Sequence, residues 1–297
     1  GAVAVAEPAA SAVVGTAPAT AGSGNAATVL TGGAGSPSLQ GDLFAASQDT
    51  AARAVMPAAG DAEGVSYDTI DTVEHVYHTV SDPAELAALV KRLSETEAFC
   101  FDTETTGFDV FGDRLVGISL AVEPYEAWYV VCTPANTAAV LDALRPVFEN
   151  ERIAKIGQNL KFDIMVMKVA GVEVKGRLYD TMIIHYLLDP ESRHGMDYLS
   201  RSFLNYSPVP IESLIGKGAR QLTMDRVAVE VVSAYSCEDA DVTLRLKEVL
   251  WPKLVEAGQD KLYLEIEEPL IRVLADIEMT GVKIDLESLA ASGRELN

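Results

Sequence analysis

The chain is poor in cysteine and in basic residues. Its three cysteines lie inside or beside apolar runs without a paired spacing, so we expect buried reduced thiols rather than disulfides or a zinc site. Acidic residues outnumber basic ones by 44 to 23, and the resulting formal charge of −21 repels polyanions. This charge excludes a protein that grips nucleic acid through bulk electrostatics, and any such contact must be local or metal-mediated.

Long apolar runs are also missing. The chain contains no stretch of about 18 strongly apolar residues, and it begins at Gly1 without an initiator Met or a basic leader. We therefore expect a soluble, cytoplasmic protein with no membrane segment. The Gly1 start suggests a fragment or a processed product.

The composition changes near residue 70. Residues 1–70 are mostly Ala, Gly, Ser, Thr and Val with scattered Pro, and they contain almost no aromatic or large aliphatic side chains. Such small side chains bury too little apolar area to offset the entropy of ordering them, so we predict an Ala/Gly-rich, flexible and disordered linker. A cleaved targeting peptide is less favoured because the segment is poor in Arg.

From about Glu74 onward the pattern is that of an α/β domain. Strand patterns come first and helical spacings follow, with one strand-helix-strand passage, which predicts a mixed sheet of about five strands flanked by helices. The expected strands include 98–103, 115–122, 127–132 and 152–156, and the expected helices are 83–93, 136–148, 160–169, 179–188, 196–204, 225–235 and 239–255.

The first acidic segment lies at the end of an apolar strand. Asp102 and Glu104 are two residues apart, so both side chains project from one face of the strand while Phe101 and Thr103 point to the other. Two close carboxylates in a partly dry cleft raise each other's pKa unless cations neutralise them. Oxygen ligands suit Mg²⁺ or Mn²⁺, and no histidine has zinc-ligand spacing with an acid pair. The alternative is the polar end of a strand that enters a turn.

Two further segments place polar side chains at helical spacing. Asn159 and Asp163 stand at i and i+4, on one face and near the start of a predicted helix. The alternative is that Asn159 only caps the helix and that Asp163 is a solvated acid. Tyr235 and Asp239 repeat the same spacing, and there the alternative is an ordinary core tyrosine.

Together, the order and spacing of these segments resemble the three motifs of the 3′-to-5′ exonuclease superfamily that uses four acidic residues and a tyrosine. A histidine version of the last motif is excluded because Ala234 occupies that position. The chain from about Val76 onward further resembles the proofreading exonuclease domain of bacterial DNA polymerase I, a family A polymerase, and this resemblance implies a ribonuclease H-like fold. The matching stretches are 155–163, 193–197, 216–223 and 235–244.

The resemblance also implies a catalytic set, which is Asp102, Glu104, Asp163, Tyr235 and Asp239. Asp102 would bridge two divalent cations, Mg²⁺ or Mn²⁺, with Glu104 and Asp239 completing the site of the cation that binds the attacking water. Asp163 would hold the second cation, which stabilises the departing 3′ oxygen. Tyr235 and Glu104 would orient the water, and the products would be nucleoside 5′-monophosphates.

The expected substrate is a single-stranded or frayed 3′ end of DNA. Phe108 stands where the family places an apolar side chain that wedges against the terminal base, and the alternative is a core phenylalanine. Gln158, Asn159 and Arg193 could contact sugar or phosphate. For Arg193 the alternative is a surface salt bridge.

The resemblance also implies the domain organisation. Residues 71–258 correspond to the exonuclease domain, and residues 259–297 resemble the truncated start of a polymerase domain, which would act in cis in a longer parent protein. No polymerase active site is present in the chain. Two alternatives are a catalytically silent domain of a family A polymerase and a ribonuclease D-like RNA-trimming enzyme. The four retained carboxylates oppose the first, and the polymerase-like junction opposes the second.

Overall fold

A six-stranded mixed sheet forms the centre of the described part of the chain. The computed structural model describes residues 66–218 and 221–296. The strands lie side by side in the order β1-β4-β3-β2-β5-β6; β3 is antiparallel to β2 and β4, and the other neighbouring strands are parallel. Their bounds are β1 (Val76–Val80), β2 (Ala98–Thr105), β3 (Leu115–Glu123), β4 (Glu126–Val131), β5 (Ala154–Gly157) and β6 (Leu178–Asp180). The expected mixed sheet is confirmed.

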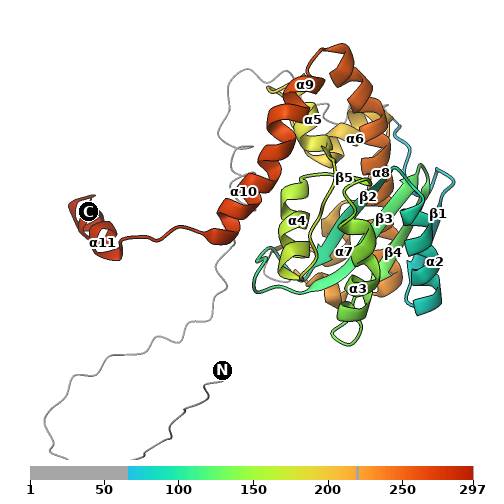
Figure 1. Ribbon diagram of the computed structural model, residues 1–297, viewed down its shortest axis with the longest axis horizontal. Coiled ribbons are helices and arrows are strands. Elements are labelled where there is room, and N and C mark those ends of the chain that lie inside the picture. Colours follow the sequence, from blue (N-terminus) through green and yellow to red (C-terminus); the bar gives the residue numbers. More distant parts are fainter. Residues whose placement is uncertain (1–65, 219–220, 297) are drawn as a thin grey trace, which may run out of the picture. The chain divides into compact units, whose positions relative to one another are not determined.

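Helices flank the sheet (Figure 1). The helices and helical turns of the described residues are α2 (Pro83–Ser94), α3 (Thr137–Phe148), α4 (Leu160–Val169), α5 (Thr181–Leu188), α6 (Met196–Leu204), α7 (Ile211–Ile215), the 3₁₀ turn η2 (Met224–Arg226), α8 (Val229–Glu256), α9 (Asp260–Leu262), the π-helical turn η3 (Tyr263–Glu267), α10 (Glu268–Thr280) and α11 (Leu286–Leu296). None of the helices in the described residues has the length and apolar character of a membrane span.

Alternation along β2 divides the core between the two faces of the sheet. Phe99 and Phe101 join the apolar cluster formed with α2, α3 and α4, whereas Cys100 joins a second cluster with the long helix α8. The ring of Phe148, from α3, meets Phe99 and Phe101 edge-on at centroid distances of 5.3 and 5.0 Å. Edge-on rings add a directional attraction to the area that they bury. This packing fixes β2, the strand that carries the first two acids.

The structure differs from the sequence prediction at several elements, and helices α7, α9 and α10 were not among those expected. The expected helices 225–235 and 239–255 are wrong as separate elements, because α8 runs unbroken from Val229 to Glu256. Its middle buries polar side chains, among them Ser236, Glu238 and Asp241, which bond other elements, so the apolar spacing is interrupted while the helix continues. Strand β1 was not expected, and neither was β6, whose three residues merge in sequence with the helical pattern of α5.

The predicted linker lies almost entirely outside the described residues, on 1–65. Of its last five residues, Asp68 forms an isolated parallel bridge with Tyr206. Its amide donates to the Asn205 carbonyl at 2.9 Å, and its own carbonyl accepts from the Ser207 amide at 2.8 Å. The boundaries of the linker and of the two expected domains stay predictions.

Replacing Phe148 by alanine should lower the free energy of unfolding by about 3–5 kcal/mol, because the ring is fully buried and its removal leaves a cavity between α3 and β2. Urea denaturation of the purified chain measures this loss. Phe111→Ala is the matched control: that ring is 65% exposed, and its removal should change the same free energy by less than about 0.5 kcal/mol. Equal effects of the two substitutions would contradict the described core.

Candidate active site

Strand β2 supplies two carboxylates to the face covered by α8. Asp102 pairs across the sheet with Ser119, and Glu104 pairs with Gly117. Glu104 is 7% exposed, and its Oε1 accepts a 2.5 Å hydrogen bond from the Ser236 hydroxyl of α8. Both acids therefore lie between the sheet and α8, as the two-residue spacing predicts.

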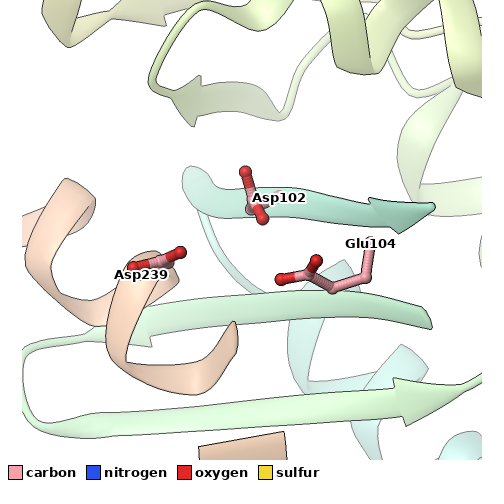
Figure 2. A group of neighbouring side chains, drawn as sticks. All are labelled: Asp102, Glu104 and Asp239. Atoms are coloured by element: carbon pink, nitrogen blue, oxygen red, sulfur yellow. The ribbon is translucent and has the colours of Figure 1, made fainter. Parts of the chain in front are cut away.

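Helix α8 brings a third carboxylate to the same place. Asp102, Glu104 and Asp239 each offer an oxygen within 4.8 Å of the others. Figure 2 shows the carboxylates of Glu104 and Asp239 turned toward one another, with Asp102 beside them on β2. The segments that supply these acids lie more than 130 residues apart in sequence, so the packing of α8 against β2 creates the cluster.

Asp163 reaches the strand from α4. It is 3% exposed, and its Oδ1 accepts hydrogen bonds from the amide of Thr103 at 3.0 Å and from the hydroxyl of Thr103 at 2.5 Å. Because Thr103 alternates with Asp102 and Glu104, it points to the opposite face of β2. Asp163 is therefore held beside the group of three carboxylates without belonging to it.

Burial of the carboxyl groups and repulsion between them raise the free energy needed to ionise them. Burial raises the pKa of Asp102 well above its ordinary value, and repulsion from Asp163, Glu104 and Asp239 adds to that rise. Burial also raises the pKa of Asp239 strongly, with Glu104 the next cause. The pKa of Asp163 rises to about 7 through burial, although its bonds from Thr103 oppose the rise.

The site fits a divalent cation. Asp239 Oδ1 is buried and has no hydrogen-bond partner among the described residues, although buried carboxylate oxygens normally have one. The nearest donor set consists only of carboxylate oxygens, which suit hard cations of the Mg²⁺ type. A cation would satisfy the orphaned oxygen and remove the repulsion that raises these pKa values.

Tyr235 faces the same group from one turn earlier on α8. Burial raises the pKa of its phenol, and the charges of Asp239, Glu104 and Asp102 raise it further. The hydroxyl therefore stays protonated at neutral pH and can donate to an oxygen in the site. Tyr235 also packs against the apolar cluster between the sheet and α8, so its catalytic role stays a prediction.

Two of the predicted substrate residues are exposed. Phe108 has 60% of its surface accessible, and its ring lies 6.3 Å from that of Phe162, the neighbour of Asp163. It is therefore not a core phenylalanine. Arg193 is exposed and forms no ion pair with any described residue, so the salt-bridge alternative has no support.

The other two predicted substrate residues lie where β5 turns into α4. The side chain of Gln158 donates to the His194 carbonyl at 2.8 Å and accepts from the Thr181 hydroxyl. Asn159 adopts left-handed backbone angles, φ 60° and ψ 45°, and its side chain forms no cap hydrogen bond. The alternative in which Asn159 caps α4 through its side chain is therefore wrong. Contacts of all four residues with a substrate stay predictions.

Sequence reasoning missed the hydroxyls that hold the acids. Thr103 holds Asp163 and Ser236 holds Glu104, as described above. Thr103 carried a signal, because alternation points it away from the acid pair and toward the face on which the helix of Asp163 packs. Ser236 carried none, since its relation to Glu104 depends on how α8 crosses the sheet.

Strand β2 carries two of the clustered acids and helix α8 carries the third. The chain that folds in this way matches the model of a known nuclease family. The family model described as 3′-5′ exonuclease, of the DNA polymerase A type, matches residues 77–255. The chain therefore belongs to the 3′-5′ exonuclease family of DNA polymerase A. The resemblance drawn from the sequence motifs is confirmed.

Its relatives are DNA polymerases I. The chain is 41% identical over 232 residues to DNA polymerase I of Pseudomonas aeruginosa, a match that covers 74% of this chain and 25% of that protein. It is 40% identical over 223 residues to DNA polymerase I of Chloroflexus aurantiacus, covering 72% of this chain and 24% of the relative. The chain thus spans about a quarter of the length of these relatives. Neither match favours the RNA-trimming or the silent alternative.

Solved structures share the fold. The POL domain of Pol1 from M. smegmatis, in complex with DNA primer-template and dNTP, aligns with a TM-score of 0.58 at 20% identity, over 73% of this chain and 34% of that one. NrnC of Brucella melitensis aligns with a TM-score of 0.55 at 20% identity, over 70% of this chain and 94% of that one. The expected α/β exonuclease fold is confirmed.

Without metal, the chain should become less stable as the pH rises from about 4 to about 7. The folded pKa of Asp163 is raised from 3.8 to about 7, so the folded state binds more protons than the unfolded state in this window, and stability falls as those protons leave. Melting temperatures in EDTA measure the slope. Mg²⁺ should restore stability at pH 7–8, and Asp163→Asn should flatten the metal-free slope. A wild-type melting temperature in EDTA that rises across this window would contradict the described site.

Removing the hydroxyl that holds Glu104 should slow nucleotide removal while the fold is kept. Ser236→Ala is expected to lower kcat by about tenfold to a hundredfold, because partners of metal-binding carboxylates have effects of that size. Ser233→Ala is the matched control: this serine lies one turn earlier on α8 and bonds Thr79 at 2.6 Å, so its rate should stay within about twofold of wild type. Indistinguishable rates for the two variants would rule out a role for Ser236.

Proposed function

We propose that this chain removes nucleotides one at a time from the 3′ end of single-stranded or frayed DNA, with two divalent cations, and that it edits for a polymerase domain in the same parent protein. The observation that carries the proposal is the meeting of Asp102, Glu104 and Asp239 within 4.8 Å, in a chain of the 3′-5′ exonuclease family. Three carboxylates at that distance, two of them buried and one half-buried, are costly unless cations accompany them.

The four acids divide between two cations. Asp102, Glu104 and Asp239 would hold one cation, and Asp163 with Asp102 would hold the other. When bound, the cations supply Lewis-acid stabilisation of the charge that develops on the phosphate and on the attacking and departing oxygens. Mg²⁺ or Mn²⁺ is favoured because every donor is a carboxylate oxygen.

Protein groups position the attacking water. Tyr235 keeps its proton and donates to the water, while Glu104 accepts a hydrogen bond from it. The Ser236 hydroxyl fixes the rotamer of Glu104 and occupies one of its oxygens, so the other oxygen is turned to the site. Tyr235 and Ser236 both lie on α8, so one helix positions the Tyr235 hydroxyl for the water and the Ser236 hydroxyl for Glu104.

Substrate contacts are local because the net charge of −21 opposes any broad attraction to DNA. Phe108 offers an exposed ring on which the terminal base can stack. The exposed guanidinium of Arg193, which has no ion pair among the described residues, can bind a phosphate. Gln158 and Asn159, at the start of α4, contribute polar contacts to the sugar. A paired end must fray before its phosphodiester can reach carboxylates buried this deeply.

Substituting a metal-binding acid should abolish the activity. We expect the 297-residue chain to shorten 3′-labelled single-stranded DNA with Mg²⁺ or Mn²⁺, and Asp102→Ala or Asp163→Ala to lower the rate at least about a hundredfold. Gel analysis of the labelled strand measures the rate, and an RNA strand of the same sequence tests the substrate class.

Asp142→Ala is the control, because this acid lies on α3 with a side chain 73% exposed. Its rate should equal that of wild type. In EDTA, Asp102→Ala should melt no lower than wild type, since it removes a carboxylate that repels three others. Unchanged cleavage by both Asp102→Ala and Asp163→Ala would contradict the assignment of the metal site. Faster cleavage of RNA than of DNA would contradict the proposed substrate.

A further inference from the structure

Asp180 is a fully buried acid outside the set of five catalytic residues. It ends β6, and only 1% of its surface is exposed. Its Oδ1 accepts from the amides of Asn159 at 3.1 Å and Met182 at 3.0 Å, with Ile183 at 3.4 Å, while its Oδ2 accepts from the amide of Leu160 at 2.8 Å. One carboxylate thus binds the first amides of two different helices, α4 and α5.

Helix α4 depends on this carboxylate for its first turn. The first amides of a helix have no acceptor inside the helix and need one from outside. Asn159 occupies the N-cap position, but its left-handed backbone and the absence of a side-chain cap bond leave that need unmet. Asp180 meets it from the neighbouring strand, since β6 runs parallel to β5 with Asp180 directly beside Gly157.

The bond to Leu160 cannot be explained by the capping of α5. A residue that capped only its own helix would use one oxygen, and Oδ1 already accepts the amides of Met182 and Ile183. The second oxygen, Oδ2, forms the shortest of the four bonds, and it forms that bond with α4. Asp180 therefore caps α5 through Oδ1 and binds the first amide of α4 mainly through Oδ2.

Asp163 lies three residues after Leu160, in the first turn of α4. Its carboxylate is anchored to β2 by Thr103, while its main chain is positioned by the start of the helix that Asp180 holds. Asp180 itself is fixed from behind: its amide donates to the hydroxyl of Tyr263 at 2.7 Å, and that hydroxyl donates to the Leu178 carbonyl at 3.2 Å.

We propose that Asp180 is a positioning residue that fixes the start of α4 so that Asp163 presents its carboxylate at the cation site. The proposal rests on the proposed function for the role of Asp163. Loss of the Oδ2 acceptor leaves a buried amide unpaired and loosens the first turn, and the displaced Asp163 then binds its cation more weakly.

Asp180→Asn tests the proposal, because an amide nitrogen replaces one of the two acceptors with almost no change of shape. With Mn²⁺ alone as the probe, paramagnetic resonance should show about tenfold weaker binding at one site. The kcat for 3′-labelled single-stranded DNA should fall about tenfold with KM within about threefold. Amide hydrogen exchange at Asn159 and Leu160 should become faster.

A double-mutant cycle shows whether Asp180 acts through Asp163. In the Asp163→Asn background, Asp180→Asn should produce no further loss of Mn²⁺ affinity, because the affected ligand is already absent. A separate further loss would overturn the proposal. Glu268→Gln is the matched control: this buried carboxylate accepts from the Leu178 amide at 3.3 Å, at the other end of β6, and contacts neither Asn159 nor Leu160. Its Mn²⁺ affinity should stay within about twofold of wild type.

If Asp180→Asn does not fold, Tyr263→Phe tests the proposal in its place. It removes the hydroxyl behind Asp180 and should weaken Mn²⁺ binding in the same direction by a smaller factor. If Asp180→Asn folds and keeps the wild-type Mn²⁺ affinity and kcat, the positioning role is wrong. If only Tyr263→Phe can be measured, the same result for that variant would also overturn the role. If the wild type does not cleave DNA, the proposed function is refuted instead. The Mn²⁺-affinity and hydrogen-exchange measurements would still test the positioning role of Asp180.

Discussion

The mutual repulsion of buried carboxylates is the constraint on which the site depends. Asp102, Glu104 and Asp239 meet within 4.8 Å and Asp163 lies beside them, so each charge raises the cost of the next. In the described part of the chain, none of the four has an ion pair with a lysine or arginine. Their protein partners are hydroxyls and amides, which orient a carboxylate without neutralising it. The described part of the fold thus leaves these acids without a protein cation, which supports the proposed metal site.

A neighbouring acid on the same helix shows the contrast. Asp241 is also buried, but it bonds Arg245 at 3.4 Å, the Tyr77 hydroxyl at 3.0 Å and the Tyr125 amide at 2.6 Å. Its charge is compensated by the protein, so it serves to join α8 to β1 and to the turn between β3 and β4. Two residues along α8, Asp239 keeps an oxygen with no partner. Both carboxylates are buried, and they differ in that Asp241 has a protein cation beside it whereas Asp239 has none among the described residues.

Prediction from sequence worked where a local rule governed the element. Helices 160–169 and 196–204 were predicted with the bounds that the structure gives to α4 and α6, and alternation placed Asp102 and Glu104 on one face of β2. It failed where packing decided. The middle of α8 satisfies its polar side chains through Glu104 and Tyr206, so the helix continues where the apolar pattern stops. Strand β6 is three residues long and exists because β5 pairs with it.

The amino-acid sequence by itself determined the exonuclease family, because its motifs depend on residue types at characteristic spacings. The resemblance carried by those motifs also predicted the candidate acids and the tyrosine that accompanies them. Tertiary structure alone decided how the acids are held. Ser236 reaches Glu104 across 132 residues, and Asp180 reaches the start of α4 from the neighbouring strand across about 20 residues. Such contacts depend on the register of parallel strands and on the angle at which α8 crosses the sheet. No local pattern encodes either quantity, since both arise from the packing of the whole core.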